Sequence, residues 1–140
     1  MKKIVIATML AITTAAFAGD VTVSATRDTK LDKNGVTVGT SVGGLAVSAT
    51  KIDDVYNRFA VGKDFSVTKV GPVALTAGVA AVYQDSQVGR NGFGLNVGAK
   101  ATYPLAKNLD LVGGVSRFYG QERVDQYNGT TTQLGVTYKF

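Results

Sequence analysis

The chain has 140 residues and a formal net charge of +5, and its basic residues are spread along the sequence rather than gathered in blocks. This length fits one domain, and a mild, dispersed positive charge is not typical of a nucleic-acid-binding protein. Cys and His are both absent, which excludes disulfides, the usual zinc sites, Ser-His-Asp triads and Cys-His dyads. We therefore expect no catalytic, metal or cofactor site.

The first eighteen residues have the pattern of a secretory signal peptide. Met1, Lys2 and Lys3 form a short basic segment, residues 4–15 are apolar, and residues 16–18 form an A-x-A cleavage site. An N-terminal membrane anchor is the alternative, but the apolar segment is shorter than the about 20 residues that a transmembrane helix needs. We expect a signal peptide over 1–18, export through the Sec pathway, and one folded domain over 19–140.

The rest of the chain predicts an all-β protein. Apolar residues alternate with small or polar ones at a period of two, and no helical period competes with this pattern. The predicted strands are, in chain order, 20–27, 36–43, 45–53, 58–68, 73–84, 93–103, 109–119 and 131–140. Most have about the 9–11 residues that a tilted transmembrane strand needs, and only a closed barrel pairs every strand in lipid. We therefore predict an eight-stranded, antiparallel, up-and-down transmembrane β-barrel.

The connections between the predicted strands alternate in length. Three are short turns, at 43–44, 69–72 and 104–108, whereas the other connections, 28–35, 54–57, 84–92 and 120–130, are mostly longer and more polar. Short turns at one end and longer loops at the other are typical of bacterial barrels, in which the turns face the periplasm and the loops face the outside. An even strand number then places both ends of the barrel domain on the periplasmic side.

Aromatic residues gather near the predicted strand ends. The outer ends carry Tyr56, Phe59, Tyr83, Phe93, Phe118, Tyr119 and Tyr127, and the periplasmic ends carry Phe65, Tyr103, Tyr138 and Phe140. Aromatic girdles at the two membrane interfaces produce this distribution, and aromatic caps on the strands of a soluble barrel are the alternative. The residues that we assign to the girdles are Phe59, Phe65, Tyr83, Phe93, Tyr103, Tyr138 and Phe140.

The opposite face of the strands is small and polar. An eight-stranded barrel is just wide enough for side chains to fill. Asp64, Lys100, Asp110 and Lys139 share the inward parity, and we expect Asp110 and Lys139 to be cross-strand partners. Two interpretations remain open: a charged path through the barrel, or a polar network that fills the lumen.

Lys63 departs from the pattern, because it falls on the lipid-facing parity. A Lys at the bilayer midplane of a barrel costs about 2–4 kcal/mol. The sequence thus predicts either a β-bulge that shifts the register near Lys63, or a position close to an interface from which the side chain reaches water.

The last predicted strand carries Leu134, Val136, Tyr138 and Phe140 on one face. It resembles the C-terminal strand of bacterial outer-membrane barrels, and the whole mature chain resembles the small eight-stranded family of the OmpA membrane domain, OmpX and the opacity-type proteins. The resemblance implies that these four residues are the signal for the barrel-assembly machinery, with periplasmic chaperones assisting. It also implies a monomer in the outer membrane, in contact with lipid and lipopolysaccharide. Because no residue follows Phe140, we expect no periplasmic peptidoglycan-binding domain.

Three functions are compatible with these sequence features. The first is a structural and surface-interaction barrel with a filled lumen, and the second is a narrow pore for small solutes or ions. The third is a soluble periplasmic barrel for a small ligand, which would need an apolar lumen and a polar exterior. Enzyme activity is not expected, because the small outer-membrane acyltransferases and deacylases use a catalytic His in their families and this chain has none.

Overall fold

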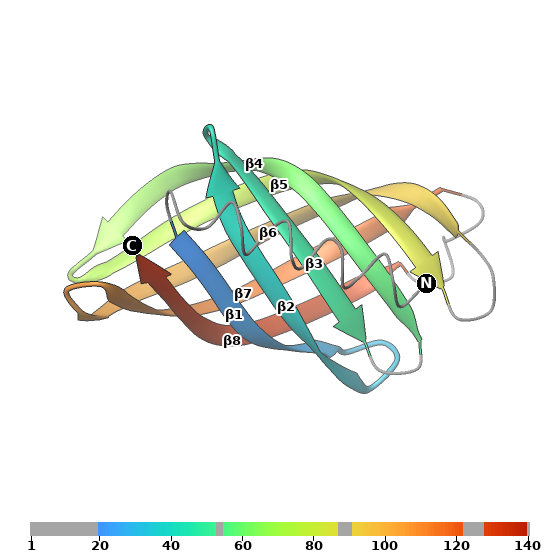
Figure 1. The fold of residues 1–140 in the computed structure, drawn as a ribbon, viewed down its shortest axis with the longest axis horizontal. Helices are drawn as coiled ribbons and strands as arrows, with labels where there is room; N and C mark the ends of the chain where they lie inside the picture. The colour runs from blue at the N-terminus through green and yellow to red at the C-terminus, as the bar shows by residue number, and fades with distance from the viewer. Residues whose placement is uncertain (1–19, 53–54, 87–90, 122–127, 140) are drawn as a thin grey trace.

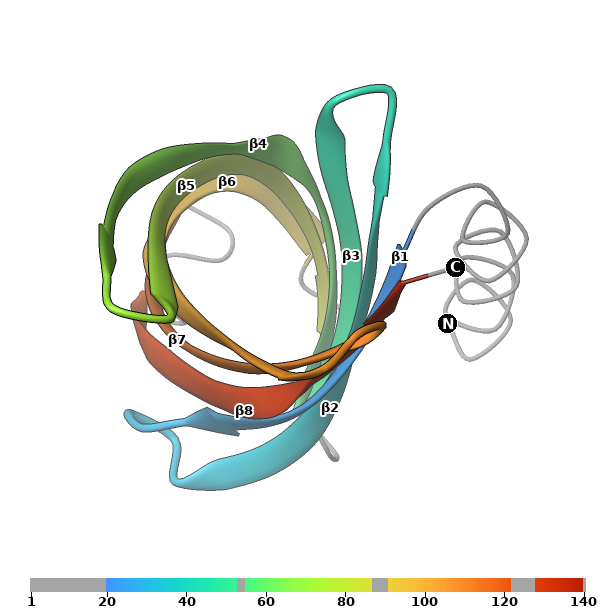
Figure 2. The ribbon, with the colours of Figure 1, turned by 90° about the vertical axis from the view of Figure 1, so that its left-hand side faces the viewer.

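The computed structural model describes residues 20–52, 55–86, 91–121 and 128–139. Within these ranges eight strands form one closed barrel, in which each strand pairs antiparallel with the next and β8 pairs with β1 (Figures 1 and 2). The strands are β1 (Asp20–Asp28), β2 (Lys33–Val42), β3 (Leu45–Ile52), β4 (Tyr56–Val70), β5 (Val73–Ser86), β6 (Asn91–Ala106), β7 (Leu109–Gly120) and β8 (Gly129–Lys139). The predicted fold is confirmed. The described residues contain no helix long and apolar enough to cross a membrane.

The alternation of short and long connections is confirmed. Residues 43–44, 71–72 and 107–108 are the short turns, whereas 29–32, 53–55, 87–90 and 121–128 join the strands at the other end. Gly43, Gly44 and Gly71 have φ values of 58°, 83° and 60°. These values lie in the left-handed region, where glycine has no steric penalty, so the turns at 43–44 and 71–72 use a residue suited to them.

Several strands extend beyond their predicted ends, and the loops are correspondingly shorter. β2 begins at Lys33 rather than at 36, and β6 covers Asn91–Ala106 rather than 93–103. Pro104 lies inside β6, beside a register shift, although a turn was predicted there. The hydrophobic pattern marks only the part of a strand that faces lipid, whereas backbone pairing continues into water without apolar residues.

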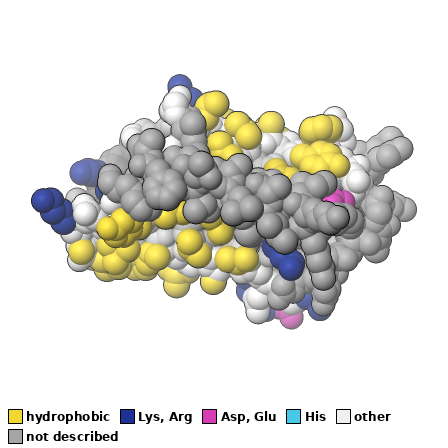
Figure 3. Space-filling model, viewed as in Figure 1, with side chains coloured by type: hydrophobic (Ala, Val, Ile, Leu, Met, Phe, Trp, Pro, Cys, Tyr) yellow, Lys and Arg dark blue, Asp and Glu magenta, His cyan; other side chains and the backbone are white. Residues whose placement is uncertain are grey.

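The two faces of the barrel wall differ in chemistry. The exposed large hydrophobic side chains fall at alternate positions along the strands, apart from a few beside the turns, and Figure 3 shows such side chains over much of the described surface. The inward rows carry small and polar residues; one row joins Ser24, Thr37, Thr50 and Arg58 across four strands. This is the reverse of a soluble ligand-binding barrel, which has a polar exterior and an apolar lumen.

Candidate functional site

Inside the loop-bearing end of the barrel, an arginine lies between two aromatic rings. The guanidinium carbon of Arg58 (β4) is 4.1 Å from the ring centre of Tyr56 (β4) and 3.9 Å from that of Phe118 (β7). All three residues are buried, with exposed fractions of 7%, 1% and 0%. Cation–π attraction is strongest where water is excluded, so the two rings stabilise the charge of Arg58 in place of water.

Hydrogen bonds fix the groups around this arginine. Arg58 Nε donates to Gln84 Oε1 at 2.6 Å, and Gln84 Nε2 donates to Ser86 Oγ at 3.2 Å. The hydroxyl of Tyr56 donates to Asp28 Oδ2 at 2.7 Å, while the other carboxylate oxygen of Asp28 accepts from a backbone N–H in the first loop. We call Asp28, Tyr56, Arg58, Gln84 and Phe118 the lumen cluster. It ties β1, β4, β5 and β7 together across the barrel interior.

Tyr56 and Phe118 lie at the loop-bearing ends of their strands, where the sequence placed them, but neither belongs to a membrane girdle, because both side chains point into the lumen. Tyr56 is paired with Ser86 in the inward rows, and Phe118 is paired with the inward Asn96. Closeness to a strand end suggested a membrane girdle, but the face of the strand decides whether an aromatic ring contacts lipid or lumen. Tyr56 is two positions from the inward Arg58, and Phe118 is two positions from the inward Ser116, so each shares a strand face with an inward residue. This spacing is the sequence signal that could have identified both residues.

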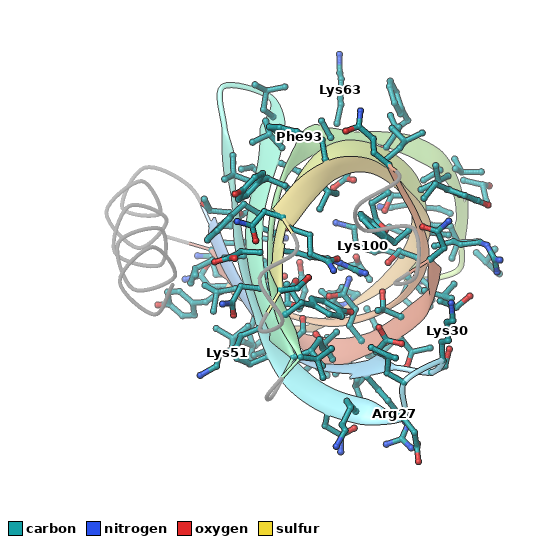
Figure 4. All side chains as sticks on the ribbon, turned by 90° about the vertical axis from the view of Figure 1, so that its right-hand side faces the viewer. Arg27, Lys30, Lys51, Lys63, Phe93 and Lys100 are labelled. Atoms are coloured by element: carbon teal, nitrogen blue, oxygen red, sulfur yellow. The ribbon has the colours of Figure 1, made fainter. Side chains whose placement is uncertain are left out.

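The other half of the lumen is open. A cavity of about 330 Å³ lies there, and Lys100 points into the barrel in Figure 4. Lys100 Nζ is 2.8 Å from Asp64 Oδ2, and Lys139 Nζ is 2.8 Å from Asp110 Oδ2. All four of these charged residues line the cavity. They form two separate ion pairs, and no salt bridge joins one pair to the other within the described residues.

Hydroxyl groups along the inner wall are hydrogen-bonded to one another. Thr37 Oγ1 lies 2.6 Å from that of Thr26 and 2.8 Å from that of Thr50, which links three adjacent strands. Thr22 and Thr137 make a similar contact at 2.7 Å across the β1–β8 seam. These hydrogen bonds are the cross-strand pairing expected of a polar sheet face. At these positions the inner wall is polar and its hydroxyl groups are paired with one another.

The residues assigned to the girdles are on the outer face wherever the structure describes them. Phe93 is 60% exposed, and its ring meets Tyr83 edge to face with centroids 5.2 Å apart. Phe59 is half-buried, and Phe65, Tyr103 and Tyr138 are exposed. The proposed assembly signal has Leu134, Val136 and Tyr138 exposed on the outside of β8. Phe140, Tyr127 and the predicted signal peptide over 1–18 lie outside the described residues.

Lys63 remains on the outer face and points away from the barrel (Figure 4). A register shift does occur in β4, but it falls between Ser66 and Thr68, after Lys63, so the bulge does not turn this side chain inward. The ammonium lies 5.7 Å from the centre of the Phe65 ring. A lysine beside an exposed aromatic ring is the arrangement expected near a membrane interface.

Within the described ranges, no three His, Cys, Asp or Glu side chains are grouped to hold a metal ion. The lumen cluster and the two ion pairs are the chemically distinctive groups of the barrel. These groups are suited to filling the lumen and linking its strands, because each described charge among them has an ion pair, a hydrogen bond or a cation–π contact with another side chain.

A comparison with protein-family models matches residues 1–129 to the family described as YfaZ precursor. The chain belongs to this family. No curated protein sequence matches the chain significantly.

Solved structures with a similar fold are transmembrane barrels. The de novo designed TMB2.3, solved by solution NMR, has a TM-score of 0.63 at 17% identity, over 87% of this chain and 93% of that chain. A second designed transmembrane β-barrel has a TM-score of 0.62 at 20% identity, over 87% and 94%. The outer membrane protein Ail of Yersinia pestis, in a phospholipid bilayer nanodisc, has a TM-score of 0.53 at 14% identity, over 87% and 99%. The likeness establishes the fold: this chain has the fold of an eight-stranded transmembrane β-barrel.

Proposed function

We propose that the protein is an integral barrel of the bacterial outer membrane, exported through the Sec pathway after loss of residues 1–18. The apolar outer face, the two-residue turns at one end and the precursor description of the family support this location. Its partners on this proposal are outer-membrane lipid and lipopolysaccharide, and during biogenesis the barrel-assembly machinery and periplasmic chaperones.

The role that we propose is structural and surface-interacting, with a closed lumen and no catalysis. The observation that carries this proposal is Arg58 held between Tyr56 and Phe118, three buried side chains that occupy the lumen at its loop-bearing end. An eight-stranded barrel leaves little space beside such side chains. The open half of the lumen supports the competing function, a narrow pore, because an ion could reach Asp64 and Lys100 from that side.

Conductance in planar bilayers tests the choice between the two functions. A closed barrel gives no current for the native protein or for Lys100→Gln, since both retain the lumen cluster. A triple variant in which Tyr56, Arg58 and Phe118 are all replaced by Ala should open small, steady channels. The pore proposal instead expects current from the native barrel and a changed ion preference in Lys100→Gln. Each variant is first checked for the gel mobility shift on boiling that marks a folded barrel.

A further inference from the structure

The register leaves one side of β4 without a neighbouring strand over its second half. β3 pairs with β4 from Ile52 with Tyr56 down to Ala46 with Gly62, whereas β4 continues to pair with β5 as far as Val70. Residues 63–70 of β4 therefore have a strand on one side only in the part of the chain that the structure describes. We call this segment the β4 edge. In Figure 1 the β4–β5 hairpin projects beyond the nearby ends of β1 and β3.

Three observations place most of the β4 edge outside the hydrocarbon layer, on the periplasmic side. β1, β2 and β3 have 9, 10 and 8 residues, close to what one crossing needs, whereas β4, β5 and β6 have 15, 14 and 16. Lys63 is on the outer face, where a charge is tolerated only near an interface. Unpaired backbone groups are not tolerated in lipid. The boundary on this side of the barrel thus lies close to Lys63.

The β4 edge has the surface chemistry of a binding site. Val67 and Val70 are each 63% exposed, which is unfavourable in water unless another chain covers them, whereas Phe65, 51% exposed, lies at the membrane boundary near Lys63. Lys63 and Lys69 lie toward the two ends of the segment, and neither makes an ion pair within the described ranges. An unpaired edge with apolar side chains and flanking lysines matches an extended, acidic polypeptide.

We propose that the β4 edge docks an extended acidic segment of a periplasmic protein by β-strand addition. A second copy of this chain does not fit. Two copies inserted in the same direction are related by a two-fold axis along the membrane normal, so their β4 strands run in the same direction. Two identical edges can pair symmetrically only when the strands are antiparallel, so the two β4 edges cannot pair with each other. The added strand therefore comes from the periplasm. This proposal does not depend on whether the lumen conducts.

The test uses the full barrel in phospholipid nanodiscs and a fluorescent eight-residue peptide of alternating Val and Thr with Glu at both ends. Fluorescence polarisation measures binding, and amide hydrogen exchange locates it. Before peptide is added, amides within residues 63–70 should exchange faster than those of β5. Peptide should slow exchange within 63–70. A peptide N-methylated at every residue should not bind, because neither of its edges can donate a ladder of backbone hydrogen bonds.

Charge reversal provides the matched variant. Lys63→Glu with Lys69→Glu should weaken binding by roughly fivefold or more, as expected for two lost cross-strand charge pairs. Lys51→Glu with Lys107→Glu makes the same change in net charge away from the edge and should bind as the native barrel does. Absence of native binding, equal binding of the N-methylated peptide, or protection outside 63–70 would overturn the proposal. If the edge variant does not fold, the N-methylated peptide still decides the question with the native protein.

Discussion

Replacing Arg58 by alanine should lower the stability of the barrel more than replacing any other lumen cation. The side chain is 7% exposed, contacts two aromatic rings and donates a 2.6 Å hydrogen bond to Gln84. Buried cation–π contacts contribute about 1–2 kcal/mol each, and a hydrogen bond that involves a charged group about 1.5–3 kcal/mol. Because such contributions do not add fully, we expect Arg58→Ala to reduce the free energy of unfolding by about 3–5 kcal/mol.

Urea unfolding of barrels refolded into phospholipid vesicles measures this loss, with circular dichroism and gel mobility as two independent probes. Lys100→Ala is the matched control, because its ion pair with Asp64 is about one third exposed on each side, and such pairs contribute about 0–1 kcal/mol. Combining Arg58→Ala with Phe118→Ala should cost less than the two separate losses together, since both changes remove the same contact. Equal losses for Arg58→Ala and Lys100→Ala would refute the account of the lumen cluster.

Three further predictions use the same unfolding measurement. A methyl group on Gly98 would lie 2.7 Å from the Cβ of Ser116, whereas one on Gly113 meets no atom closer than 3.9 Å. Gly98→Ala should therefore lower the free energy of unfolding by about 1–3 kcal/mol, and Gly113→Ala should leave it almost unchanged. On the outer face, Leu134→Arg in the middle of β8 should cost about 2–4 kcal/mol, and Thr130→Arg near its end about 0–1; equal costs would contradict the proposed depth. Asp110→Asn should cost about 1 kcal/mol or less, and the loss should shrink in molar salt, because the lysine that pairs with it is half exposed.

The sequence predicted the architecture because lipid imposes a simple rule on every membrane-facing residue. Leu95 and Val97 on one strand and Leu134 and Val136 on another are apolar at a period of two, since each must contact lipid. The dipeptide Gly43-Gly44 predicted the turn between β2 and β3, because glycine adopts the left-handed backbone conformation that this turn needs. These are local constraints, so they can be recognised without knowing which strands are neighbours.

The lumen could be predicted only in part. The inward parity of Asp64, Lys100, Asp110 and Lys139 followed from alternation, and the structure places all four along the cavity. The lumen cluster was missed, because Tyr56 and Phe118 were judged by their nearness to strand ends. Their contact through Arg58 joins β4 to β7, which are not neighbours in the barrel, so no pairing rule along the chain could reveal it.

The sequence by itself thus determined the number of strands, the two alternating sets of side chains and the end of the barrel at which the turns lie, because each depends on local periodicity and turn chemistry. Periodicity alone does not say which set faces outward; the terminal strand and the aromatic residues indicated that. Only the tertiary structure decided how far each strand continues, which inward side chains meet across the lumen, and where β4 lacks a partner. Those features depend on strand register, and register is set by the closure of the whole barrel rather than by any one segment.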